Sequence, residues 1–64
     1  MTIKNLQTGK IVVGGFATMS DAVDIIIDGM PHDLYPYLVI DDETGDDICI
    51  VYNGAVWYPN NPHL

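Results

Sequence analysis

Cys49 is the only cysteine in a chain of 64 residues, and this limits how the fold can be supported. A domain of this length buries only about 60% of the surface that its unfolded chain exposes. Disulfides, a structural metal or self-association usually supply the missing stability. One cysteine excludes an intrachain disulfide, and with two histidines it gives too few ligands for a four-ligand zinc site. We expect one domain, residues 1–64, without metal or cofactor, that depends on close packing, self-association or a partner.

The charge balance is strongly acidic, with nine acidic residues, two lysines, no arginine and a net charge of −7. Phosphate binding depends on Lys and Arg, so direct binding to nucleic acid or to an anionic membrane is disfavoured. The same charge steers a protein toward a basic partner surface. The sequence shows neither a signal peptide nor the roughly 20 apolar residues of a membrane span. Together with the lone cysteine, these features favour the cytoplasm.

Turn and capping residues divide the chain into the predicted order ββαβββ. Thr8 and Gly9 separate two strand-like segments, 2–6 and 10–15, which predicts an N-terminal hairpin. A helix is predicted over 20–30, and three further strands follow it. This order indicates an α+β fold with one helix packed on a largely antiparallel sheet.

The predicted helix begins near Ser20, a good N-cap residue, and Thr18 with Asp21 makes a weaker variant of the capping box. Gly29 and Pro31 close the helix. At about 100° per residue, its apolar residues share one face. That face consists of Ala22, Val23, Ile26, Ile27 and Met30. The opposite side carries a stripe of Asp21, Asp24 and Asp28. Ile25 falls among these aspartates, which predicts an exposed isoleucine with a charged surround.

The three C-terminal strands are predicted at 37–41, 48–52 and 55–58. An acidic turn joins the first two strands, and Asn53-Gly54, the strongest short hairpin signal, joins the last two. The Asn53-Gly54 turn pairs Tyr52 with Ala55, Val51 with Val56 and Ile50 with Trp57. A loop centred on Thr44 and Gly45 would pair Asp42 with Asp47, Ile40 with Cys49 and Leu38 with Val51. The tail 59–64 lacks periodicity and is not expected to join the sheet.

This register predicts two apolar sheet faces for a chain with only one helix. One face would carry Leu38, Ile40, Cys49, Val51, Val56 and Tyr58. The other would carry Tyr37, Val39, Ile48, Ile50, Tyr52 and Trp57. We assign the first face to the helix, so the aromatic face needs the N-terminal hairpin, a second copy or a foreign partner as cover. The opposite assignment, with Trp57 in the core, stays open.

All the acids except Asp33 fall in two groups, the helix stripe and the segment 41–47. Carboxylates one helical turn apart can imitate part of a row of nucleic-acid phosphates, and Ile25 would be an apolar anchor within a charged rim. The predicted partner-binding residues are Asp21, Asp24, Ile25, Asp28, Asp41, Asp42, Glu43, Asp46 and Asp47. The alternative is an ordinary solvated surface, against which the scarcity of lysines argues.

Asp42 opposite Asp47 would place like charges together, which a partner's base or a calcium ion could offset. The order of acids does not match an EF-hand loop, so no metal site is predicted. A second candidate interface is apolar and consists of Tyr37, Ile50, Tyr52 and Trp57. Aromatic residues are enriched at interfaces, although ordinary core packing is the alternative.

No catalytic residue is predicted. His32 and Asp33 are adjacent, and adjacent residues rarely point into one site. Cys49 has no nearby base or cation in sequence to lower its pKa. The pair Gly14-Gly15 lacks the helix and lysine of a phosphate-binding loop.

Two functions remain for this non-enzymatic domain. The first is an acidic binding or inhibitory protein that occupies a basic, nucleic-acid-binding surface of another protein as a DNA mimic would. Its size and its span from Met1 to a short tail suggest a free-standing product of the phage or mobile-element kind. The alternative is a self-associating domain that forms a homodimer through an apolar sheet face and has no inhibitory role.

Overall fold

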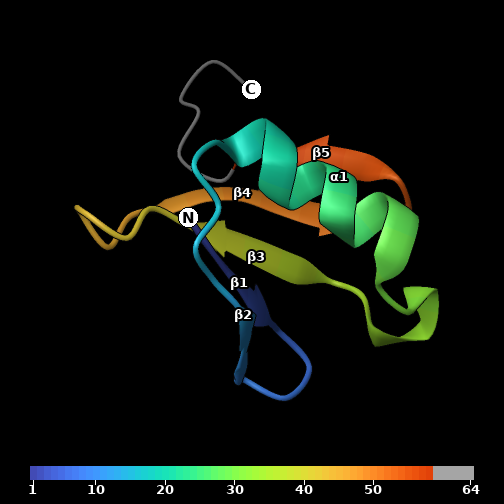
Figure 1. The fold of residues 1–64 in the computed structure, drawn as a ribbon. Helices are drawn as coiled ribbons and strands as arrows, with labels where there is room; N and C mark the ends of the chain where they lie inside the picture. Colours follow the sequence, from blue (N-terminus) through green and yellow to red (C-terminus); the bar gives the residue numbers. More distant parts are fainter. Residues whose placement is uncertain (59–64) are drawn as a thin grey trace.

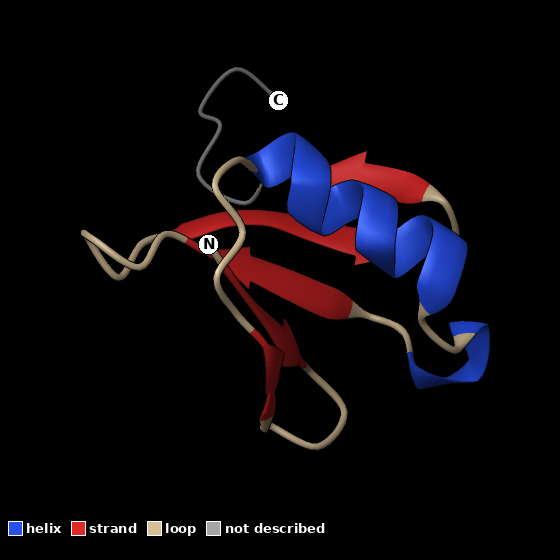
Figure 2. Ribbon diagram, viewed as in Figure 1, coloured by secondary structure: helices blue, strands red, loops and turns tan. Residues whose placement is uncertain are grey.

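In a computed structural model, which describes residues 1–58 apart from the side chain of His32, one helix lies across a five-stranded antiparallel sheet (Figures 1 and 2). The strands are β1 (Thr2–Asn5), β2 (Ile11–Val13), β3 (Tyr37–Ile40), β4 (Asp47–Tyr52) and β5 (Ala55–Trp57). The helix is α1 (Met19–Gly29), and a short 3₁₀ helix, His32–Leu34, follows it. The predicted α+β fold and the order ββαβββ are therefore confirmed. The tail 59–64 lies outside the described residues.

The N-terminal hairpin forms around the predicted turn. Gly9 adopts a positive φ of 73°, which glycine accepts without steric cost, and its N–H donates to the carbonyl of Asn5 at 2.9 Å. The Asn5 side chain accepts hydrogen bonds from the N–H groups of Gln7 at 2.9 Å and Thr8 at 3.0 Å. Local hydrogen bonds thus replace ladder pairing in the turn, and the strands are shorter than predicted.

Helix α1 begins one residue earlier than predicted because Thr18, not Ser20, is its N-cap. Thr18 has extended backbone angles, and its hydroxyl accepts a hydrogen bond from the N–H of Asp21 at 3.2 Å. Such a bond satisfies one of the helix-terminal donors that have no partner within the helix. The prediction of Ser20 was wrong because both residues are good caps, and the sequence alone did not show which one ends the preceding extended segment.

The core lies between α1 and the middle of the sheet. Helix residues Ala22, Val23 and Ile26 are buried there, as the helical spacing predicted, whereas Ile27 of the same predicted face is exposed. They belong to a cluster that also contains Ile3, Tyr35, Tyr37, Val39, Cys49 and Val51. Figure 1 shows α1 over β3 and β4, while the N-terminal hairpin extends the sheet beside β3. The strand order is β2-β1-β3-β4-β5.

The predicted register of the last hairpin is confirmed. Asn53 and Gly54 both have positive φ, 51° and 80°, as a tight hairpin turn requires. The observed partners are Tyr52 with Ala55, Val51 with Val56, and Ile50 with Trp57. Here the turn alone determined how two strands align.

The predicted register of β3 and β4 is wrong by one residue. The observed partners are Leu38 with Ile50, Val39 with Cys49, and Ile40 with Asp47, with an irregularity after Val39. The loop is closed by the Asp41 N–H, which donates to the carbonyl of Asp46 at 2.9 Å. Its centre therefore lies nearer the N-terminus than Thr44-Gly45. A shift of one residue moves every side chain of a strand to the opposite face.

Two consequences follow for the sheet faces. Tyr37 and Val39 point toward α1, with exposed fractions of 1% and 0%, so Tyr37 is a core residue and not part of an outer interface. The face away from α1, here called the outer sheet face, carries Leu38, Ile50, Tyr52 and Trp57. Leu38 is buried, whereas Tyr52 and Trp57 are 52% and 58% exposed. The N-terminal hairpin extends the same sheet beside β3.

Candidate protein-binding surface

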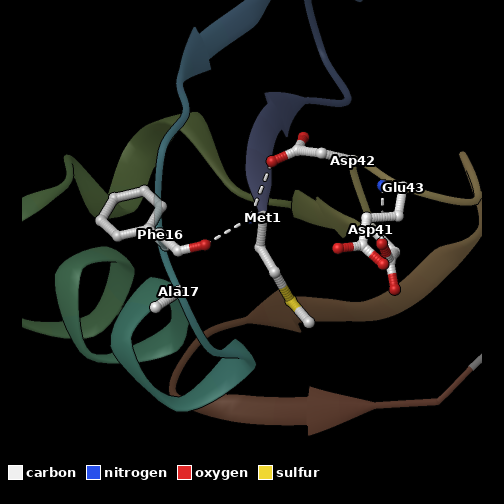
Figure 3. A pocket seen from close by; sticks show the side chains of 6 residues that line it. All are labelled: Met1, Phe16, Ala17, Asp41, Asp42 and Glu43. Carbon is white, nitrogen blue, oxygen red and sulfur yellow. Dashed lines mark hydrogen bonds and ion pairs between the residues drawn. The ribbon is translucent and has the colours of Figure 1, made fainter.

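The segment 15–17 lies in the connection between β2 and α1 and is held by hydrogen bonds to Met1. The N–H of Phe16 donates to the carbonyl of Met1 at 3.1 Å, and the Met1 ammonium donates to the carbonyl of Phe16. The ring of Phe16 is half-buried against the core cluster. Figure 3 shows Phe16 and Ala17 on one side of Met1 and three acids on the other. Met1 therefore joins segment 15–17 to the acidic turn.

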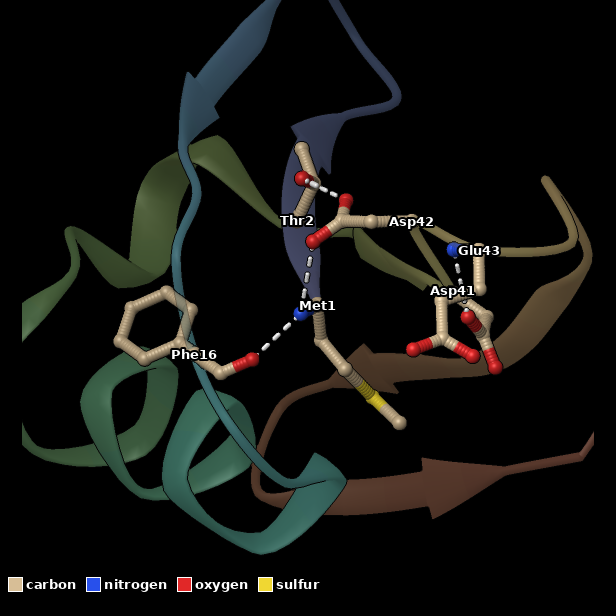
Figure 4. A network of polar contacts seen from close by, with 6 residues as sticks. All are labelled: Met1, Thr2, Phe16, Asp41, Asp42 and Glu43. Carbon is tan, nitrogen blue, oxygen red and sulfur yellow. Dashed lines mark hydrogen bonds and ion pairs between the residues drawn. The ribbon is translucent and has the colours of Figure 1, made fainter.

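Asp42, in the acidic turn, contacts both Met1 and Thr2. Its carboxylate lies 2.8 Å from the Met1 ammonium and also accepts a hydrogen bond from the hydroxyl of Thr2 (Figure 4). The hydrogen bond from the ammonium, followed by that from Thr2, lowers the pKa of Asp42. Asp42 is thus not opposed to Asp47, as the predicted register required, and its charge is compensated by the amino terminus.

This ion pair predicts a specific pH dependence. A carboxylate with a lowered folded-state pKa stabilises the fold above its unfolded pKa of about 3.9, and the stabilisation is lost as the pH falls through the folded value. With the Met1 amine free, Asp42→Asn is expected to lower the free energy of unfolding at neutral pH, and its difference from wild type should vanish in acid. Urea unfolding from about pH 6 to about pH 2 measures both curves.

Asp46→Asn is the matched control because Asp46 is an exposed acid of the same turn and makes no ion pair with Met1. It should leave the pH dependence close to that of wild type. Identical curves for the two variants would show that the contact between Met1 and Asp42 does not stabilise the fold.

The acidic turn has a defined shape. Its backbone is closed by the Gly45 N–H, which donates to the carbonyl of Asp41 at 2.8 Å, and Gly45 has a positive φ of 77°. The Asp41 side chain accepts a hydrogen bond from the N–H of Glu43 at 2.8 Å. The Thr44 hydroxyl accepts one from the N–H of Asp46 at 3.2 Å. The turn therefore presents its carboxylates from a hydrogen-bonded frame.

Two hollows adjoin on this side of the molecule and share Phe16 and Ala17. The acidic hollow has a volume of about 420 Å³ and is lined by Met1, Phe16, Ala17, Asp41, Asp42 and Glu43. The apolar hollow has a volume of about 510 Å³ and is lined by Gly15, Phe16, Ala17, Asp21, Asp24 and Ile25. Segment 15–17 thus lies between two groups of acids that are far apart in the sequence.

Six of the predicted partner-binding residues line these two hollows. They are Asp21, Asp24, Ile25, Asp41, Asp42 and Glu43. Asp28, Asp46 and Asp47 are exposed but line neither hollow. Ile25 is 45% exposed, as its place among the aspartates predicted.

Sequence reasoning missed Phe16 and Ala17. The available signal was a lone phenylalanine between two glycines and a helix cap, where an apolar side chain commonly packs on the first turns of the helix. The contact of Met1 with Asp42 had no local signal because these residues meet only through the pairing of β1 with β3.

The charged side chains that line the two hollows are all acidic. Within residues 1–58, Asp21, Asp24 and Glu43 make no ion pair with another described residue. Both lysines, Lys4 and Lys10, belong to the N-terminal hairpin. The charges of these acids are therefore available to an external cation.

The apolar interface predicted from the sequence is divided by the fold. Tyr37 lies in the core, where its hydroxyl donates to the carbonyl of Pro31 at 3.1 Å and burial raises its pKa. Ile50, Tyr52 and Trp57 remain together on the outer sheet face, and Ile50 is opposite Trp57. The ring of Tyr52 also lies 6.0 Å from that of Tyr35. The outer sheet face is thus smaller than predicted but still carries exposed aromatic rings.

Cys49 is fully buried, and burial raises the pKa of its thiol, so the reactive thiolate is disfavoured at neutral pH. Among the described residues, no three His, Cys, Asp or Glu side chains are placed to hold a metal ion. The interpretation of His32 and Asp33 stays a prediction because the His32 side chain is not described. Within residues 1–58, no helix has the length and apolar content needed to cross a membrane.

Comparison with protein families, curated proteins and solved structures found no match for this chain. Function is therefore inferred from the geometry of the chain itself.

Proposed function

We propose that this chain is a small acidic binding protein that docks on a basic surface of another protein in the cytosol. One observation supports this most strongly. The fold places the helix acids Asp21 and Asp24 and the turn acid Glu43 around segment 15–17, and none of the three makes an ion pair with another described residue.

Exposed carboxylates without basic neighbours favour association with a cation in two ways. They accelerate the encounter with a positively charged surface, and they repel anionic partners such as nucleic acid. Basic protein surfaces that bind nucleic acid carry clustered Lys and Arg. An acidic protein on such a surface would compete with the phosphates, and an inhibitory role follows from that competition.

Affinity capture from the lysate of the native host tests this function. Three baits are compared, namely wild type, the double variant Asp24→Lys/Glu43→Lys and the control Ile11→Lys/Val12→Lys/Asp33→Lys, which changes the net charge by the same amount at exposed positions outside both hollows. A protein with a basic surface is expected on wild type and control at about 50 mM salt, and it should elute by about 500 mM. Retention that ignores salt and is equal on all three baits would contradict the proposed function.

Homodimer formation is the second candidate function, and the exposed rings of Tyr52 and Trp57 favour it. A pair of aromatic side chains beside Ile50 could be covered by the same face of a second copy. The expected result is a dimer mass in analytical ultracentrifugation that Trp57→Asp converts to a monomer with an unchanged circular dichroism spectrum. A wild-type monomer at micromolar concentration would reject this candidate.

A further inference from the structure

The apolar hollow lies beside α1 and combines apolar with acidic lining. Its apolar lining comes from Phe16, Ala17 and Ile25, and its acidic lining from Asp21 and Asp24. Ile25 is 45% exposed and Phe16 is half-buried, so both can still bury surface against a ligand. The hollow, of about 510 Å³, is shallow and open, so a side chain would lie against its lining and would not be enclosed by it.

The charges at this hollow select the chemistry of the occupant. Asp21 and Asp24 line the apolar hollow, and neither makes an ion pair with another described residue. The acidic hollow lies next to it on the other side of Phe16. An apolar segment flanked by acids would be repelled here. A second copy docked through the same surface would bring the acids of both chains together. An apolar side chain flanked by Lys or Arg would cover the exposed surface of Ile25, and its flanking cations would pair with both aspartates.

We infer that the apolar hollow binds a protein segment in which one large apolar side chain is flanked by Lys or Arg. The apolar side chain lies against Ile25 and Phe16, and the flanking cations pair with Asp21 and Asp24. This inference rests on the proposed function and adds a specificity element to it, because charge alone would not distinguish such a segment from any other basic one.

Two pentapeptides of equal charge test the inference directly. Both are acetylated and amidated, with two lysines on each side of a central residue, which is leucine in one and glycine in the other. Titrations followed by NMR of the isotope-labelled chain give the two dissociation constants. The leucine peptide is expected to bind roughly tenfold more tightly, because the contact removes apolar surface from water.

Ile25→Ser should reduce this tenfold preference to less than about twofold, since it removes the apolar surface of the hollow. The matched control is Ile11→Ser, which makes the same change at an isoleucine of β2 that is 60% exposed and lies outside the hollow. The control should retain the full preference. Both positions are exposed, and the amide spectrum of each variant reports whether its fold is intact.

Three results would overturn the inference. They are equal binding of the two peptides to wild type, binding of neither, or a preference that Ile25→Ser leaves intact. Equal binding that still weakens with salt would leave the proposed function standing. Conversely, a leucine preference that is insensitive to Asp24→Lys/Glu43→Lys would contradict the proposed function, since the acids would then contribute nothing.

Discussion

Reversing the charges of Asp24 and Glu43 together is expected to weaken binding to the captured partner by at least about 100-fold at low salt. The two residues come from the two groups of acids on either side of segment 15–17. Close charge pairs at protein interfaces contribute about 1.5 kcal/mol or more each, and reversal replaces attraction with repulsion. Two such pairs correspond to about 3 kcal/mol, which is a factor above 100 in the dissociation constant.

The control Ile11→Lys/Val12→Lys/Asp33→Lys changes the net charge equally but at exposed positions that line neither hollow. It should weaken binding by less than about tenfold, through the long-range field alone. Isothermal titration calorimetry over a range of salt concentrations measures both effects. If this control and Asp24→Lys/Glu43→Lys bound equally weakly, net charge and not the position of the acids would govern binding.

Asn5→Ala is expected to lower the free energy of unfolding by about 2–4 kcal/mol, because three hydrogen bonds depend on one side chain. The buried Asn5 amide donates to the carbonyl of Leu34 at 2.7 Å and accepts from the N–H groups of Gln7 and Thr8. It therefore connects the N-terminal turn to the segment before β3. Domains of this size often have only about 3–5 kcal/mol from their core, so much of the variant should be unfolded.

Gln7→Ala is the control for this effect. The exposed Gln7 side chain also donates to backbone carbonyls, those of Asp33 and Tyr35, but it can exchange these bonds for water. A loss of less than about 1 kcal/mol is expected in urea unfolding. Equal losses for the two variants would show that burial of the Asn5 amide does not matter.

The sequence predicted those parts of the fold in which a local signal determines the geometry. Asn53-Gly54 specifies a two-residue turn, and so the pairing of β4 with β5 was correct. The loop between β3 and β4 has one glycine and four acids, and these residues allow its turn to be centred at more than one position. The closing bond between Asp41 and Asp46 lies one residue from the pairing of Asp42 with Asp47 that was predicted. Because of this difference, the prediction assigned Tyr37 to the wrong face of the sheet.

The candidate site was predictable on the helix and not beyond it. Helical spacing identified Ile25 as an exposed residue among aspartates, because the spacing is fixed along one element. The approach of Phe16 and Asp42 to one another depends on β1, which brings Met1 beside both. Contacts between distant segments depend on strand order, and strand order has no local signal in this sequence.

Chemical-shift mapping of the isotope-labelled chain with the captured partner tests the central claim most directly. The largest changes are expected at residues 15–17, 21–25 and 41–43, which surround the two hollows. They should be absent at the same residues when Asp24→Lys/Glu43→Lys is titrated. Changes confined to Ile50 and Trp57 would place the binding surface on the outer sheet face and contradict the account.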